Sequence, residues 1–258
     1  MEERGYRIFV PEEEEPDRES EVFYNREMIT NRDLSVISAE TFLEQAGIQD
    51  PRICDALAAS GIRGFRYSEL GEVHINDSNP SAVEAIREGL EENNISAEIH
   101  EEDANVLLSE MRNVFHIVDI DPFGPFTPYL DSAARAANHS SLVGLTATDN
   151  SSTSGSYPKV CKRRYGSTPL KESFMHEVGL RIYLKEAFRN FARYDKDFDP
   201  KLSWHERHYS RVTGRVTESK QRTNSSLENV GYLSFCPDCR WRKLQKQDEC
   251  ANCENTDV

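Results

Sequence analysis

The fold is decided by the segment Asp55-Ala-Leu-Ala-Ala-Ser-Gly-Ile-Arg-Gly64. An apolar stretch at 52–57 predicts a short strand, and the small residues that follow turn the chain into a predicted helix toward Leu70. The next predicted strand, 73–76, is followed by Asp77, 22 residues after Asp55. Because parallel strands are joined by such helical crossovers, the segment indicates a parallel α/β sheet.

The same alternation continues on both sides of this segment. Helices are predicted over 34–45, where Gly47 supplies the stop, and from the cap Asn79-Pro80 through about residue 92. The further predicted strands are 97–100, 114–120, 142–148 and 208–216, and a long amphipathic helix follows residue 170. Strands that alternate with helices in this way favour a doubly wound, mostly parallel sheet.

Three segments carry weaker patterns. Residues 22–33 follow an acidic opening and have no clear period, so we expect residues 1–33 to form a lid. Residues 223–229 are polar and predict a linker, and Gly231-Tyr-Leu233 predicts a strand beyond it. We therefore expect a large domain at 1–228, lid included, and a small second domain at 229–258.

Charge is divided unequally along the chain. Of its 258 residues 37% are hydrophobic and no apolar run reaches membrane-spanning length, so we expect a soluble, cytoplasmic protein without a membrane partner, and we predict no protein partner. The net charge is −14, but residues 1–130 carry 10 Lys and Arg against 29 Asp and Glu, whereas 131–258 carry 21 against 16. Lys159, Lys162, Arg163 and Arg164 form a basic cluster. A polyanion such as RNA is therefore expected to dock on the second half.

A second informative stretch, Ile117-Val-Asp-Ile-Asp-Pro-Phe-Gly-Pro-Phe-Thr-Pro-Tyr-Leu130, ends a predicted strand at Asp121. Pro122 stops the strand and restricts Asp121 to an extended conformation. Because ligands of open α/β sheets bind at the carboxyl ends of strands, Asp121 and Phe123 are candidates to contact one. Phe123 can stack on a planar base, while Asp121 accepts a hydrogen bond from its amino group. The alternative is that Asp-Pro only begins a turn.

Four acids lie near the carboxyl ends of predicted strands: Asp55, Asp77, Asp103 and Asp121. The turn after Asp55 lacks G-x-G-x-x-G, whose second glycine admits a pyrophosphate, so a nucleoside without phosphates fits better. S-adenosylmethionine is such a ligand. Asp77 would bind its ribose and Asp103 its adenine amino group, while Arg32 and Arg63 are candidates for its carboxylate. The alternative for each acid is a turn or cap role.

Six cysteines divide into two kinds. Cys236-Pro-Asp-Cys239 and Cys250-Ala-Asn-Cys253 have the spacing of a tetrahedral four-cysteine zinc site, whereas two disulfides are disfavoured in an intracellular chain. We therefore expect structural Zn²⁺ in a zinc ribbon. Cys54 lies in an apolar strand, where a packing role is expected, and Cys161 lies in a predicted basic, exposed loop.

Six motifs follow one another along the chain. They are Phe23-Tyr-Asn25, Asn31-Arg-Asp33, the segment 55–64, Asn76-Asp-Ser-Asn-Pro80, Asp121-Pro-Phe-Gly124 and Gly155-Ser-Tyr-Pro-Lys-Val-Cys161. Together they resemble the archaeal and eukaryotic tRNA (guanine(26)-N(2))-dimethyltransferase family over essentially the whole chain. The resemblance implies a Rossmann-like class I methyltransferase fold with a seven-stranded sheet. It also implies S-adenosylmethionine contacts from Arg32, Arg63, Asp77, Asp103 and Ala104, catalysis by residues 121–123, and zinc on the four C-terminal cysteines.

The function that the resemblance implies is dimethylation of the exocyclic N2 of guanine 26 in tRNA, with S-adenosylmethionine as methyl donor. Asp55 joins the expected cofactor residues, because it heads the turn. Family members continue beyond the cysteines into a tRNA-binding domain, whereas this chain ends at Val258, so we expect a C-terminally truncated member. Two alternatives stay open: methylation of an amino group at another tRNA or rRNA position, and a catalytically weak zinc-ribbon module that binds RNA.

Overall fold

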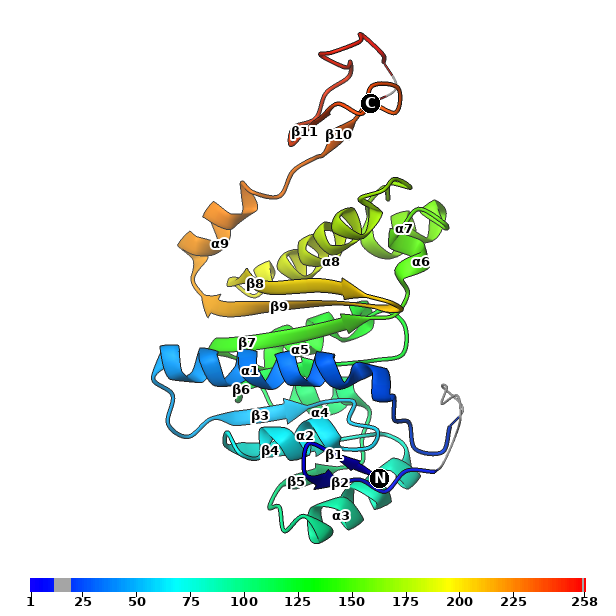
Figure 1. Ribbon diagram of the computed structural model, residues 1–258. Helices are drawn as coiled ribbons and strands as arrows, with labels where there is room; N and C mark the ends of the chain where they lie inside the picture. The colour runs from blue at the N-terminus through cyan, green and yellow to red at the C-terminus, as the bar shows by residue number, and fades with distance from the viewer. Residues whose placement is uncertain (12–19, 257) are drawn as a thin grey trace. The chain divides into compact units, whose positions relative to one another are not determined.

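The computed structural model describes residues 1–11, 20–256 and 258, and the chain divides into two compact units, Met1–Ser219 and Lys220–Val258. The first unit is built on one sheet of seven strands (Figure 1). In spatial order the strands are β5 (Glu98–His100), β4 (Glu72–Asn76), β3 (Arg52–Asp55), β6 (Phe115–Ile120), β7 (Ala137–Ala147), β9 (Tyr209–Glu218) and β8 (Lys196–Glu206).

Strands β3 to β7 pair in parallel, whereas β9 and β8 add an antiparallel edge. Strand order reverses between β3 and β6, and sheets of this kind bind their ligands at the carboxyl ends of the strands beside such a reversal. The prediction of a doubly wound, mostly parallel sheet of seven strands is therefore confirmed.

Helices cover both faces of this sheet (Figure 1). The helices near the first face are α1 (Ile29–Ala46), α2 (Ile62–Tyr67) and α3 (Pro80–Glu92), and those near the second are α4 (Ala104–Glu110), α5 (Leu130–Ala136) and α8 (Met175–Ala192). Phe42, Phe65 and Ile86 pack with Ile53 and Ile117 in a buried core on the first face. Alternate residues of a strand point to opposite faces, so Asp55 shares the face of Ile53.

Local signals placed several boundaries correctly. Helix α1 ends at Gly47, whose φ of 66° is the left-handed conformation that favours glycine. Helix α3 has Asn79 as its cap, with the side chain accepting from the Ser81 amide, and Pro80 in its first turn. Its predicted end near residue 92 is also confirmed.

Other boundaries were wrong. Within 22–33, the 3₁₀ helix η1 (Arg26–Met28) and the first turns of α1 replace part of the predicted lid, while residues 12–19 of that lid lie outside the described residues. Strand β7 begins five residues before the predicted 142. Strand β8 was not predicted, because the polar and proline residues Asp199 to Lys201 interrupt the apolar alternation.

The second unit was also predicted incompletely. Helix α9 (Lys220–Leu227) occupies most of the expected linker, and β10 (Ser234–Phe235) pairs with β11 (Arg242–Lys243) just beyond the expected strand at 231–233. The unit begins at Lys220, nine residues before the expected domain start at 229, and that boundary stays a prediction. Among the described residues no helix has the length and apolar character needed to cross a bilayer.

Candidate active site

Three of the four predicted acids order the loops at the carboxyl edge of the sheet. The Asp55 carboxylate accepts from the Gly64 amide at 2.9 Å. Asp77 accepts from the amides of Ala59 at 2.8 Å and Asn79 at 2.9 Å, and Asp103 caps α4 by accepting from the Asn105 amide at 2.8 Å. The cap and turn roles are thus real, and Asp77 and Asp103 keep lone pairs for a ligand because an ionised carboxyl group accepts about four hydrogen bonds.

The turn after β3 is held close to its neighbours. Gly61 has φ of 76°, and a Cβ there would lie 2.8 Å from Ile86 Cγ1, so a larger residue would be strained and would push on α3. Asn76, fully buried, donates from Nδ2 to the carbonyl oxygens of Ala56 and Glu102 at 2.9 and 3.1 Å. This amide therefore ties the turns after β3, β4 and β5 together.

Asp55 is fully buried at the carboxyl edge of the sheet, and this burial raises the pKa of its carboxyl group to about 7. The pKa of an aspartate in the unfolded chain is about 4. Between about pH 4 and pH 7 Asp55 is therefore protonated in the folded state and ionised in the unfolded state. Stability from this group falls as pH rises through that window, by up to about 4 kcal/mol.

We therefore expect Asp55→Asn, which cannot ionise but can still accept from Gly64, to gain stability relative to the unsubstituted chain as pH rises from 4 to 7. Urea unfolding at one-unit pH intervals measures this difference, with the exposed Asp50→Asn as control. Parallel stability curves for the unsubstituted chain and Asp55→Asn would contradict the expectation.

Asp121 is held by a buried arginine. It follows β6 directly, and its carboxylate forms an ion pair with Arg63 of α2. Arg63 also donates to Ser35 Oγ at 2.8 Å and Asn31 Oδ1 at 3.1 Å, both on α1. Because the guanidinium is fixed on three sides, it fixes Asp121 at the carboxyl edge of the sheet.

An aromatic pair includes Phe123, two residues after this carboxylate. Phe123 is 46% exposed, and its ring lies 4.4 Å from that of Phe23, at an angle of 73°. The loop that carries Phe123 is anchored to Thr148, the residue after β7. The Gly124 amide donates to Thr148 Oγ1 at 2.7 Å, and the Thr148 amide donates to the Gly124 carbonyl at 3.0 Å. Sequence reasoning assigned no role to Phe23 or Thr148, although Phe23 lies in a quoted motif.

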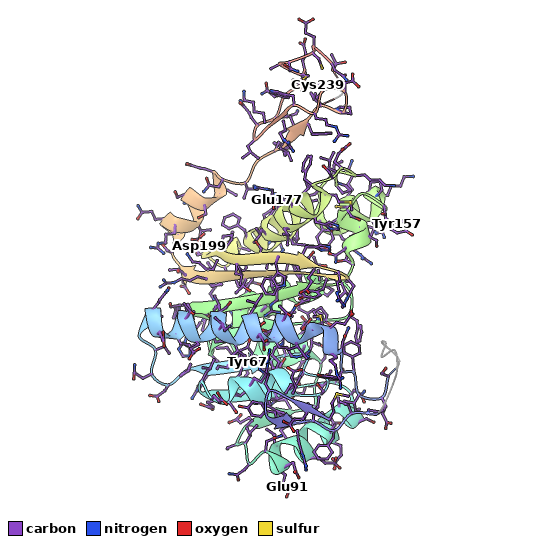
Figure 2. All side chains as sticks on the ribbon, viewed as in Figure 1. Tyr67, Glu91, Tyr157, Glu177, Asp199 and Cys239 are labelled. Atoms are coloured by element: carbon purple, nitrogen blue, oxygen red, sulfur yellow. The ribbon has the colours of Figure 1, made fainter. Side chains whose placement is uncertain are left out.

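Beneath Asp121 lies a buried charge network that the sequence did not predict. Asp119 Oδ2 accepts from Tyr67 Oη at 2.7 Å and from Arg211 Nη2 at 2.5 Å, and Arg63 Nε is 3.5 Å from Asp119 Oδ1. Figure 2 labels Tyr67 among the side chains of the chain. Burial alone would raise the pKa of Asp119, but Arg211 and Arg63 lower it below its ordinary value. Gly144 makes room for Arg211, since a Cβ there would lie 2.2 Å from Arg211 Nη2.

Arg32, the other predicted carboxylate ligand, is also engaged. Its Nε and Nη2 donate to the two oxygens of Glu3 at 2.9 and 2.5 Å, and Nη2 donates to the Asn25 carbonyl at 3.1 Å. Tyr24 Oη donates to the same Glu3 carboxylate at 2.9 Å. The structure therefore places both predicted arginines against acids of the chain itself.

The basic cluster lies on helix α7 (Pro158–Tyr165), where Lys159, Lys162, Arg163 and Arg164 are exposed. Arg164 Nη1 forms an ion pair with Asp149 at 2.9 Å. The prediction that Cys161 lies in an exposed loop was wrong: it is buried on the inner side of α7, where burial raises the pKa of its thiol to about 11. Cys161 therefore packs in the core, as does Cys54 of β3.

The four C-terminal cysteines converge. Their Sγ atoms all lie within 4.8 Å of one another, with Cys236 to Cys253 and Cys239 to Cys250 each 3.5 Å apart. A tetrahedral thiolate site with metal–sulfur distances of about 2.3 Å needs sulfurs about 3.8 Å apart, so the cluster fits such a metal.

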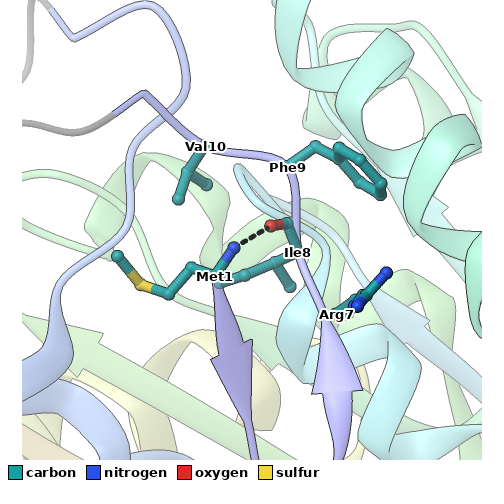
Figure 3. Close-up of a pocket in the computed structure, with 5 residues that line it drawn as sticks. All are labelled: Met1, Arg7, Ile8, Phe9 and Val10. Atoms are coloured by element: carbon teal, nitrogen blue, oxygen red, sulfur yellow. Dashed lines mark hydrogen bonds between the residues drawn. The ribbon is translucent and has the colours of Figure 1, made fainter.

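A separate hollow of about 500 Å³ lies at the N-terminal hairpin of β1 (Glu2–Glu3) and β2 (Tyr6–Arg7). Its lining residues are Met1, Arg7, Ile8, Phe9 and Val10 (Figure 3), and the Met1 nitrogen donates to the Ile8 carbonyl at 3.0 Å. None of these residues belongs to the predicted site, so this hollow is distinct from the carboxyl edge.

Residues 6–257 match a protein family described as N2,N2-dimethylguanosine tRNA methyltransferase. Over 251 residues the chain is 38% identical to the tRNA (guanine(26)-N(2))-dimethyltransferase of Methanobrevibacter smithii, covering 95% of this chain and 64% of that protein. For the enzyme of the same name from Methanothermobacter thermautotrophicus the identity is 39%, with 90% and 62% covered. The chain thus spans a little under two thirds of the length of these relatives.

Solved structures give a consistent comparison. Trm1 from Pyrococcus horikoshii, solved in complex with S-adenosyl-L-methionine, superimposes with a TM-score of 0.84 at 30% identity, covering 96% of this chain and 69% of that one. Trm5b from Pyrococcus abyssi superimposes with a TM-score of 0.58 at 12% identity, a likeness of fold alone.

Proposed function

Because the chain belongs to the N2,N2-dimethylguanosine tRNA methyltransferase family and has its class I methyltransferase fold, we propose that it dimethylates N2 of guanine 26 in tRNA with S-adenosylmethionine. The observation that supports this most is the Asp121 carboxylate, held by Arg63 at the strand end two residues before the exposed Phe123. A fixed acceptor next to an aromatic face suits a flipped-out base that carries an amino group. The proposed activity implies a cytoplasmic location, where tRNA is found.

The chemistry is a displacement at the sulfonium methyl group. The N2 lone pair forms a bond to the methyl carbon as the carbon–sulfur bond breaks, the sulfide leaves, and the nitrogen releases a proton. Asp121 would accept a hydrogen bond from N2, offset the positive charge that grows there, and take that proton. A second turnover at the same nitrogen gives the dimethyl product. Most of the acceleration comes from orientation, in which Phe123, with Phe23 behind it, holds the base plane.

The cofactor residues are proposed from the same edge. Asp77 would bind the ribose and Asp103, with the backbone of Ala104, the adenine, while Asp55 supports the turn between them. Arg32 and Arg63 would bind the cofactor carboxylate alongside their present partners Glu3 and Asp121, because a guanidinium has five donors. Carboxylates accept hydrogen bonds from hydroxyl and amino groups, and guanidinium groups donate to a carboxylate. These side chains therefore match the polar groups of S-adenosylmethionine.

For tRNA docking we propose Lys159, Lys162, Arg163 and Arg164. Since Arg164 is paired with Asp149, a test should spare it. Replacing Lys159, Lys162 and Arg163 with alanine is expected to weaken binding of every tRNA and to reduce the slope of log K against log salt concentration by up to about 2.7, or about 0.9 per phosphate contact. Filter binding over a salt series measures the slope.

A matched control replaces three exposed arginines of the acidic half, Arg52, Arg87 and Arg112, and should leave that slope unchanged. Equal slopes for the triple variant on α7 and the unsubstituted chain would place the docking surface elsewhere.

We also propose that the four C-terminal cysteines hold structural Zn²⁺. Cys239→Ser is expected to lose one zinc equivalent per chain and to lose the β10–β11 pairing, because a unit of this size lacks a core that could fold it without metal. Metal analysis and amide exchange of residues 234–243 measure the two effects. Cys161→Ser serves as control and should keep its zinc; an unchanged zinc content in Cys239→Ser would refute the site.

Nucleoside mass spectrometry tests the function directly. Incubation of this chain with S-adenosylmethionine and unmodified tRNA should add two methyl groups to guanine, and tRNA with adenine at position 26 should gain none there. Methylation at another nucleotide would favour the alternative amino-group methyltransferase. Cofactor binding without any methylation would refute the activity of this chain, and absence of both would leave the RNA-binding module.

A further inference from the structure

A second cluster of metal-binding side chains lies on the far side of the sheet from the core of Ile53 and Ile117. His74 of β4 pairs in register with Glu98 of β5, and His100 lies two residues further along β5, so the three side chains share one face. We propose that His74, Glu98 and His100 form a binding site for a divalent transition-metal ion, separate from the four cysteines and independent of the proposed methyl transfer.

The distances between the three donor atoms suit one ion. His74 Nδ1 lies 3.0 Å from His100 Nε2 and 3.3 Å from Glu98 Oε2, and His100 Nε2 lies 3.9 Å from Glu98 Oε2. A point equidistant from all three atoms lies about 2.0 Å from each, which matches the metal–nitrogen and metal–oxygen distances of zinc and related ions. The two rings are almost parallel, with an interplanar angle of 7° and centroids 5.3 Å apart, and their facing nitrogens share a hydrogen bond, so both rings must turn to direct their lone pairs at that point.

The surroundings of His74 resemble those of a metal ligand. This ring is buried and packs edge-on against Phe115 at 5.1 Å, which restricts its orientation. Its second nitrogen, Nε2, is buried and lacks a hydrogen-bond partner among the described residues, although Glu72 Oε1 lies 3.6 Å away. Ligating histidines commonly direct their second nitrogen at a carboxylate, and Glu72 is placed for that role.

Two imidazoles and one carboxylate select for ions of intermediate softness, such as Zn²⁺, Ni²⁺ and Co²⁺. The benefit to the fold is local. Strand β5 has three residues and hydrogen-bonds only to β4 in the described sheet, so an ion bridging β4 and β5 would clamp a short edge strand. The His100 carbonyl also accepts from the Asp77 amide at 3.3 Å, so the clamp would stiffen the loop after β4.

Ni²⁺ is the probe. The full chain is first dialysed against iminodiacetate, which empties weak metal sites and leaves the ion of the four-cysteine cluster in place. Calorimetric titration of the full chain should then give one Ni²⁺ per chain, and bound Ni²⁺ should raise the thermal midpoint. His100→Ala is expected to weaken Ni²⁺ binding at least about 100-fold, since loss of a ligand exceeds the 10–100-fold effect of removing an outer partner. Glu98→Gln should also weaken Ni²⁺ binding, and because the Glu98 side chain is exposed this substitution should leave the fold intact.

The matched control is His176→Ala. It removes one ring of a second histidine pair, His176 and His205, stacked at 3.7 Å. This variant and Cys239→Ser should both retain the Ni²⁺ site. Titrations without Ni²⁺ uptake, or with equal affinity in His100→Ala, Glu98→Gln and the unsubstituted chain, would overturn the proposal and leave a hydrogen-bonded histidine pair.

Discussion

Replacing Asp121 with alanine is expected to lower the rate of methyl transfer by about 10²- to 10³-fold, the range for removing one preorganised electrostatic partner. The carboxylate would no longer accept from N2 or offset the charge that develops on it. Arg63, freed from Asp121, still has Asp119, Ser35 and Asn31, so the fold should persist. Single-turnover transfer to tRNA, at saturating cofactor, measures the effect.

Asp121→Asn separates shape from charge. Its amide oxygen can accept a hydrogen bond but carries no charge and takes no proton, so the transfer rate of the asparagine variant should fall between those of the alanine variant and the unsubstituted chain. Cofactor affinity, measured by calorimetry, should stay within a few-fold in both variants. A single-turnover rate that does not change in Asp121→Ala would remove Asp121 from the reaction.

The second large effect is on stability. Arg211→Met is expected to destabilise the chain by about 3–5 kcal/mol, because methionine fills the space but leaves the Asp119 carboxylate buried with half its donors gone. Both side chains are 1% exposed, so solvent cannot replace the lost contacts. Urea denaturation followed by circular dichroism measures the change in unfolding free energy.

A double variant provides the matched control. In Asp119→Asn with Arg211→Met no uncompensated carboxylate remains, so much of the lost stability should return, and the two substitutions should be strongly non-additive. Additive losses would mean that Arg211 stabilises the chain by packing alone. Gly144→Ala should also lower the unfolding free energy, since its Cβ would displace the Arg211 guanidinium from Asp119.

The elements with strong local signals were predictable. Asn79-Pro80 and Gly47 mark helix ends through their own backbone preferences, and the apolar runs of β3, β4 and β6 need no distant partner to be recognised. The lid at 22–33 and the linker at 223–229 were wrong in part because polar helices such as the start of α1 and α9 carry no apolar period. Strand β8 was missed because its edge position lets polar residues interrupt the alternation.

The sequence by itself determined the kind of sheet, the acids that end its strands, and the cysteine spacing, since each depends on residues a few positions apart. Only the tertiary structure decided which charges meet: Arg63 with Asp121, 58 residues away, Arg211 with Asp119, 92 away, and Glu3 with Arg32, 29 away. Such pairs depend on strand order and register, which bring distant side chains onto one face. A local pattern carries no record of that order, so it can point to an acid at the end of a strand but not to the arginine that holds it.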